Sequence, residues 1–216
     1  WESGSYMRFV VNENYWGAAP LIDEIFVRFV PDDASQTAAM VAGDGDLGTF
    51  IAYSDMPALE EAGVKIVMVF SGYNEGMYFC LDEELCHPAL QDVRVRQAIA
   101  YALDRFSLNE DLLLGLTVPA VTFWDNTPFA DPSLEAYPFD PAQANSLLDA
   151  AGWVDSNGDG TRDKDGVELV LRFGTTDRQI RLDTQAVWQQ NLADVGIGIE
   201  LFSWDFDTYF ASYPDG

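Results

Sequence analysis

The chain contains 216 residues, of which 48% are hydrophobic, enough to fill the core of one large domain or of parts of two. Its 36 acidic and 11 basic side chains give a formal charge of −25, which argues against nucleic acid and anionic membranes as partners because both are densely negative. No apolar run reaches the roughly 18 residues that a membrane span needs. We therefore expect no membrane insertion of these residues and expect any signal peptide to lie outside them.

Strands and short helices alternate in the first part of the chain. A strand is predicted at residues 6–11 and a second at 22–30, whose apolar residues on both faces are typical of a covered strand. Short helices at 34–42 and 54–61 and a strand at 64–70 follow. This order is typical of a parallel or mixed α/β lobe.

The middle of the chain is organised around the sequence D-V-R-V-R-Q-A-I-A-Y-A-L-D-R at residues 92–105. Its apolar residues recur at steps of four and three, which predicts one buried stripe on a helix, and Asp92 can accept hydrogen bonds from the first free N–H groups. A strand at 77–81 precedes this helix, and another helix at 108–114 follows it. The stripe consists of Val95, Ile99, Ala102 and Phe106.

A long loop is expected at residues 115–136, and it carries aromatic side chains among several prolines. Phe123 and Trp124 lie in its middle. Such a loop forms either the wall of a binding site or a small hydrophobic cluster packed beneath the loop itself. The sequence leaves both interpretations open.

The last part of the chain again alternates helices and strands. Asp140 followed by Pro141 is a typical helix start, and Gly152 can end that helix. The later elements expected are a strand at 167–173, a helix at 177–195, a strand at 197–202 and a helix or turn at 205–213. The inward residues expected in the long helix are Ile180, Thr184, Val187 and Leu192.

Residues 155–163 read D-S-N-G-D-G-T-R-D, which places oxygen-bearing side chains at alternating positions, as in an EF-hand calcium loop. The glutamate that completes an EF-hand is replaced by Gly166, and a strand is expected where a helix should follow. A structural calcium ion in a helix-to-strand loop and a bare turn without metal therefore both stay open. The candidate ligands are Asp155, Asn157, Asp159, Thr161 and Asp163.

Nothing in the sequence indicates an enzyme. The one histidine, His87, precedes a proline and has no patterned serine or cysteine partner. The sequence contains no nucleophile elbow, zinc-protease motif or P-loop, and its many carboxylates are typical of a solvated surface. We expect no catalysis and no required cofactor.

Four segments of the sequence match the characteristic segments of one protein family, and they follow one another in the same order as in that family. Residues 12–23 contain Y-W-G and P-L-I-D, although Glu13 stands where proline is more usual, and residues 42–46 read A-G-D-G-D. The helix at 92–105 is the third segment, and residues 137–153, from Y-P-F-D-P to A-G-W, are the fourth. The chain resembles the family 5 extracellular solute-binding proteins, the peptide- and nickel-type receptors of ABC importers.

The resemblance implies a mixed α/β fold of the periplasmic binding protein-like II type, in which two lobes close over a ligand. Residues 1–76 are expected to form part of the first lobe and residues 77–216 most of the second. Members of this family are much longer than this chain, so we interpret the sequence as an internal fragment.

The resemblance also implies the function. The protein is expected to capture an oligopeptide or related small solute, outside the cytoplasmic membrane, for ABC permease subunits. An extracellular or periplasmic location is expected, with a lipid anchor in the full-length protein. By the same resemblance the loop at 115–136 lies near the ligand cleft. The expected ligand-binding residues are Tyr73, Asn74, Tyr78, Phe123 and Trp124.

One further expectation follows from the export that this family implies. Cys80 and Cys86 are expected to form a local disulfide, with two unconnected thiols as the alternative. The alternative function, based on the acidic composition and the loop at 155–163, is a calcium-stabilised extracellular scaffold or adhesion module.

Overall fold

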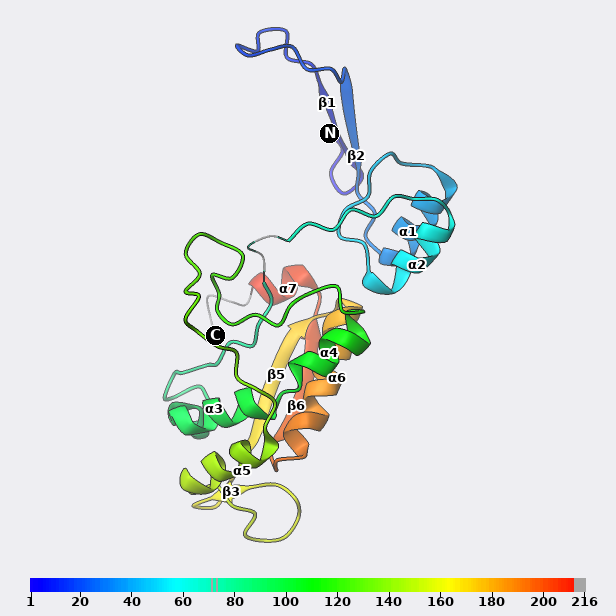
Figure 1. Ribbon diagram of the computed structural model, residues 1–216. Coiled ribbons are helices and arrows are strands. Elements are labelled where there is room, and N and C mark those ends of the chain that lie inside the picture. Colours follow the sequence, from blue (N-terminus) through cyan, green and yellow to red (C-terminus); the bar gives the residue numbers. More distant parts are fainter. Residues whose placement is uncertain (71, 73, 212–216) are drawn as a thin grey trace. The chain divides into compact units, whose positions relative to one another are not determined.

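The computed structural model describes residues 1–70, 72 and 74–211. The chain divides into two compact units, Trp1–Met68 and Val69–Gly216, and each unit is described by itself (Figure 1). The division falls earlier in the chain than the expected lobe boundary after residue 76. The assignment of the two units to two lobes stays a prediction. No helix in the described part of the chain combines the length and the apolar character required to cross a bilayer.

The first unit contains an antiparallel pair of strands and two helices. Tyr6 of β1 pairs with Arg28 of β2, and Arg8 forms an ion pair with Glu24 at 2.6 Å. Asp32 accepts a hydrogen bond from the first turn of α1. The elements are β1 (Tyr6–Val10), β2 (Glu24–Arg28), α1 (Asp33–Ala42), the 3-10 turn η1 (Tyr53–Asp55) and α2 (Met56–Glu61).

Two expectations for this unit are wrong. β2, predicted to be covered on both faces, is exposed along its whole length. Residues 64–70, predicted as a strand, form no ladder with any described residue. Apolar patterning shows which residues are suited to burial, but a strand also needs a neighbouring strand and a covering layer. Among the described residues of this unit, only Leu59 is buried.

The second unit is built around the parallel strands β5 and β6, which α6 connects (Figure 1). Val170 pairs with Gly198 at one end of this sheet, and Thr176 pairs with Trp204 at the other. The helices are η2 (Pro88–Gln91), α3 (Val93–Ala102), α4 (Arg105–Leu112), α5 (Pro141–Ala150), α6 (Gln179–Ala193) and α7 (Phe206–Ala211). The strands are β3 (Asp163–Lys164), β4 (Val167–Glu168), β5 (Val170–Thr176) and β6 (Gly198–Trp204).

The apolar stripe of α3 is buried as predicted, except for its last member. Ile99 is 1% exposed and packs in one core with α5 and the two strands, whereas Phe106 is 48% exposed. The helix ends before Phe106 because Leu103 is extended, and Asp104 caps a new helix by accepting from Ser107 N–H at 3.0 Å. A second capping aspartate therefore overrides the continued apolar period.

The inward face of α6 also differs from the expectation in part. Leu192 is buried, but Val187 is 38% exposed, and the inward position is taken by Gln185. The Gln185 amide donates to the carbonyl oxygens of Phe173 in β5 at 2.8 Å and Phe202 in β6 at 3.2 Å. A buried glutamine is accepted there because two backbone oxygens satisfy its donors.

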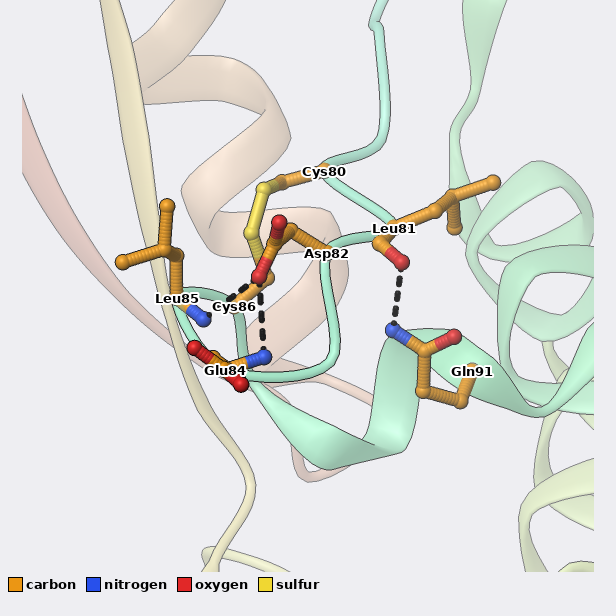
Figure 2. The surroundings of a disulfide bond; sticks show 7 residues. All are labelled: Cys80, Leu81, Asp82, Glu84, Leu85, Cys86 and Gln91. Carbon is orange, nitrogen blue, oxygen red and sulfur yellow. Dashed lines mark hydrogen bonds between the residues drawn. A yellow bond between two sulfur atoms is a disulfide. The ribbon is translucent and has the colours of Figure 1, made fainter. Parts of the chain in front are cut away.

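The structure joins Cys80 and Cys86 by a disulfide that closes a short loop before η2 (Figure 2). Inside the loop, the Asp82 carboxylate accepts hydrogen bonds from the backbone N–H groups of Glu84 and Leu85. The Gln91 amide donates to the carbonyl of Leu81 at 3.0 Å, which fixes the loop to η2. Residues 77–81, predicted as a strand, lead into this loop and form no ladder with any described residue.

We predict that Ile99→Ala lowers the free energy of unfolding by about 2–5 kcal/mol, because it removes buried methyl groups and leaves a cavity. Val93→Ala on the same helix is the control, since Val93 is 53% exposed, and we expect it to change stability by less than about 0.5 kcal/mol. Urea denaturation measures both. Equal losses in the two variants would contradict the placement of the α3 stripe in the core.

We predict that replacing both cysteines, Cys80→Ser with Cys86→Ser, lowers the free energy of unfolding by about 2 kcal/mol. The two residues are separated by 6 positions, and the loss is modest because a short closed loop restricts the unfolded chain only moderately. Urea denaturation of the oxidised wild type, the reduced wild type and the double variant is the measurement. If reduction leaves the wild-type midpoint unchanged, the disulfide has no stabilising role.

Candidate ligand-binding site

The carboxyl ends of β5 and β6 define one edge of the second unit. Thr176 and Trp204 are the last paired residues of the two strands, and α7 begins directly after β6 at this edge (Figure 1). In open α/β sheets, ligands commonly bind outside the carboxyl ends of parallel strands, where the connecting segments diverge. This edge is therefore the place to look for binding residues.

An arginine that the sequence analysis missed brings the segment around residue 75 to this edge. The Arg181 guanidinium donates to both carboxylate oxygens of Glu75, at 3.0 and 2.7 Å, and also to the hydroxyl of Thr176. Arg181 lies in the first turns of α6, just beyond the end of β5. Its place directly after a predicted strand indicates that Arg181 lies at the end of the sheet. It gives no indication that Glu75, far away in the sequence, is its partner.

The same segment also contacts the aromatic loop, as we name residues 115–136. The Asn74 amide donates to the carbonyl oxygen of Phe123 at 2.7 Å. A Cβ atom at Gly72 would lie 2.9 Å from the methyl group of Thr127, so the backbone at Gly72 lies close to that side chain. The structure thus brings Asn74 and Phe123, two of the expected site residues, into direct contact.

The aromatic side chains of the loop contact one another and remain half exposed. The rings of Phe123 and Trp124 meet edge to face with centroids 5.3 Å apart, and Trp124 meets Phe129 at 5.9 Å. Phe123 is 59% exposed and Trp124 is 52% exposed. The loop therefore holds a surface cluster whose outer faces are open to solvent, and a binding role for them stays a prediction.

Hydrogen bonds within the aromatic loop give it a defined turn. The Asp125 carboxylate accepts from the N–H groups of Val121 and Thr122 at 2.6 and 3.1 Å, and from the Thr122 hydroxyl at 2.8 Å. These bonds, first the one from Val121, hold the pKa of the Asp125 carboxyl below its usual range. The Thr127 hydroxyl donates to the carbonyl of Trp124 at 2.6 Å.

Of the two remaining expected binding residues, the structure describes Tyr78, which does not contact the aromatic loop. Tyr78 is 76% exposed, while its neighbours Met77 and Phe79 pack against the core. Within the part of the chain that the structure describes, Tyr78 makes no hydrogen bond or ring contact with the aromatic loop. Tyr73 lies outside the described residues.

The candidate calcium loop is held by its own hydrogen bonds. The Asp155 carboxylate accepts from the N–H groups of Gly158 and Gly160 at 2.7 and 3.0 Å, and the Asp163 carboxylate accepts from Ser156. In the described ranges, no three His, Cys, Asp or Glu side chains are arranged to share a metal ion. The other candidate ligands, Asn157, Asp159 and Thr161, hydrogen-bond among themselves.

A shallow hollow of about 310 Å³ lies beside this loop, before the amino end of β6 and away from the carboxyl edge. Arg162 lines it and donates to Asp149 at 2.6 Å, to Asn145 at 2.7 Å and to the carbonyl of Val195 at 2.8 Å. Because these acceptors already hold the guanidinium, the hollow is explained by the packing of the loop against α5 and α6. We do not assign a ligand to it.

The chain is similar to known proteins in both sequence and structure. The model of the bacterial extracellular solute-binding proteins, family 5 Middle, matches residues 1–216. The oligopeptide-binding protein AppA of Bacillus subtilis is 28% identical over 100% of this chain and 43% of its own length. The nickel-binding periplasmic protein of Escherichia coli is 28% identical over 98% of this chain and 41% of its own.

The solved structure of NikA from Brucella suis in complex with Fe(III)-EDTA matches with a TM-score of 0.77 and 29% identity, over 99% of this chain and 43% of that one. It confirms the expected mixed α/β fold of the periplasmic-binding-protein type. The chain spans about two fifths of the length of the curated relatives that it matches.

These relatives are solute-binding proteins by name, and the expectation of a scaffold or adhesion module finds no support among them. The family pattern seen in four sequence segments extends to the whole chain, because the family model aligns from the first residue to the last. The chain belongs to the bacterial extracellular solute-binding proteins, family 5.

Proposed function

We propose that this chain is part of the substrate-binding component of an ABC importer, which captures a peptide or a related small solute outside the cytoplasmic membrane. The observation that carries the proposal is the family match over all 216 residues. The protein binds its ligand and passes it to the permease subunits without altering it chemically. A lipid anchor outside these residues belongs to the same proposal.

The ligand class that we favour is a peptide. AppA is named an oligopeptide-binding protein, whereas the E. coli relative is named for nickel and the Brucella structure holds Fe(III)-EDTA. The charge of −25 attracts cations and repels anions at low ionic strength, which favours a neutral or cationic peptide over an anionic chelate. The half-exposed rings of Phe123 and Trp124 offer apolar surface for its side chains.

The proposed site lies at the carboxyl edge of β5 and β6, next to the contact of Asn74 with Phe123. Ligand capture then depends on closure, because a ligand favours the shut state only through contacts that the open state lacks. The aromatic loop supplies such contacts if its outer face is covered on closure.

We predict that Trp124→Ala weakens binding of an equimolar nonapeptide library to the intact protein about tenfold, because aromatic anchors carry much of the binding energy at such sites. Val154→Ala is the control, since Val154 is 46% exposed in the same unit and lines the hollow that lies away from the carboxyl edge. Isothermal titration calorimetry gives both affinities. The proposed function is wrong if the wild-type protein binds no peptide, and the proposed site is wrong if the two variants bind equally well.

A structural calcium ion at residues 155–163 is a separate proposal, supported by the alternating oxygen ligands of the sequence. Binding would require Asp155 and Asp163 to exchange their present hydrogen bonds for the metal. We predict a melting temperature at least about 3 °C higher in calcium than in EDTA, which corresponds to about 1 kcal/mol for a chain of this size. The shift should vanish in Asp155→Asn, and equal melting temperatures in calcium and EDTA would leave the loop a bare turn.

A further inference from the structure

Arg105, the first residue of α4, contacts one backbone carbonyl group within the aromatic loop and one directly after it. Its Nη1 donates to the carbonyl oxygen of Ala120 at 3.0 Å, and its Nη2 donates to the carbonyl oxygen of Tyr137 at 2.8 Å. Two points far apart in the sequence are thereby held on one planar guanidinium. Residues 120–137, which include Phe123 and Trp124, are closed into a loop whose base is a single side chain.

The environment of Arg105 shows why backbone oxygens are its partners. The side chain is half-buried, and burial lowers the pKa of its guanidinium from the ordinary value. Within the described residues, no carboxylate lies within ion-pair distance of Arg105. A partly buried cation needs strong acceptors, and the two carbonyl groups provide them without the neutralisation that a carboxylate would give.

The start of α4, which carries Arg105, is held in place by hydrogen bonds of the preceding residue. The Asp104 carboxylate caps α4 through the N–H and hydroxyl of Ser107, and the Asp104 N–H donates to Asn191 of α6 at 3.1 Å. On the loop side, the Tyr137 ring meets Tyr101 of α3 edge to face at 5.0 Å. The guanidinium therefore connects a rigid corner of α3, α4 and α6 to an otherwise exposed loop.

We propose that Arg105 is a positioning residue of the ligand site: by joining Ala120 to Tyr137 it sets where Phe123 and Trp124 stand. The part that concerns the ligand rests on the proposed function, whereas the part that concerns the order of the loop does not. Asn74 holds the same loop at the carbonyl group of Phe123, three residues after Ala120, so the aromatic rings lie next to a second tether. Loss of the tether at the base frees the rings while the core of the unit stays intact.

The test is hydrogen exchange of the intact protein, followed by mass spectrometry, in wild type, Arg105→Lys and Arg96→Lys. A lysine ammonium keeps the charge but lacks the planar fork that spans two carbonyl groups. We expect amide exchange in residues 116–136 to become about tenfold faster in Arg105→Lys, the effect of losing one charge-assisted bond. Exchange in α3 and α5 should not change.

Arg96→Lys is the matched control. Arg96 is also a partly buried arginine that donates to two carbonyl groups, those of Leu90 and Gln91, but these lie in η2 and not in the aromatic loop. We expect this variant to leave exchange in residues 116–136 unchanged. Equal acceleration in the two variants, or acceleration across the whole unit in Arg105→Lys, would show a general loss of stability and overturn the proposal.

A binding measurement separates the two parts of the inference. With the same nonapeptide library, we expect Arg105→Lys to bind about tenfold more weakly than wild type, in proportion to the population of the displaced loop. Faster loop exchange with unchanged affinity would mean that Arg105 orders the loop without serving the site, and the proposal would fail. If wild type binds no peptide, the proposed function fails, and the exchange data still decide whether Arg105 holds the loop.

Discussion

The parallel pairing of β5 with β6 constrains the rest of the second unit. Parallel strands cannot be joined by a tight turn, so the chain must cross back over the sheet, and α6 is that crossover. The crossover places the carboxyl ends of both strands at one edge, where α6 and α7 begin. Gln185 then connects the crossover to both strands, because its amide donates to one backbone oxygen of each.

Scarce cations organise the segments around this sheet. The chain has 11 lysines and arginines against 36 acids, yet several of these cations donate to backbone carbonyl groups as well as, or instead of, carboxylates. Arg94 reaches Ala150 at the end of α5, Arg162 reaches Val195 after α6, and Lys164 reaches Ala151. A guanidinium offers five donors in one plane, which suits it to joining loops and helix ends that have unpaired oxygens. Arg105 and Arg181 extend this pattern to the edge where the binding site is proposed.

The family match applies to the whole chain, whereas the geometry describes individual contacts at one end of the sheet. The family model gives the class of protein for the whole chain, and the contacts show how segments from distant parts of the sequence meet at the sheet edge. The chain spans about two fifths of the length of its relatives. The rings of Phe123 and Trp124 are half exposed, and β2 is exposed along its whole length.

The sequence by itself determined the capped helices and the family. The aspartate before each of α1, α3 and α5, and the steps of four and three in Val95, Ile99 and Ala102, specify hydrogen bonds and burial within a few residues, which is the range over which patterns act. Where two local signals competed, as at Asp104 and Phe106, the cap prevailed over the apolar period.

Tertiary structure alone decided which distant groups meet. No local pattern pairs Arg181 with Glu75, Arg105 with Ala120 and Tyr137, or Asn74 with Phe123, because these contacts depend on how the crossover and the loops are packed. The same limit explains why residues 64–70 and 77–81, which the sequence predicts as strands, form none in the part of the chain that the structure describes. Their sequences suit an extended chain, but a strand exists only where another strand supplies its hydrogen-bond partners.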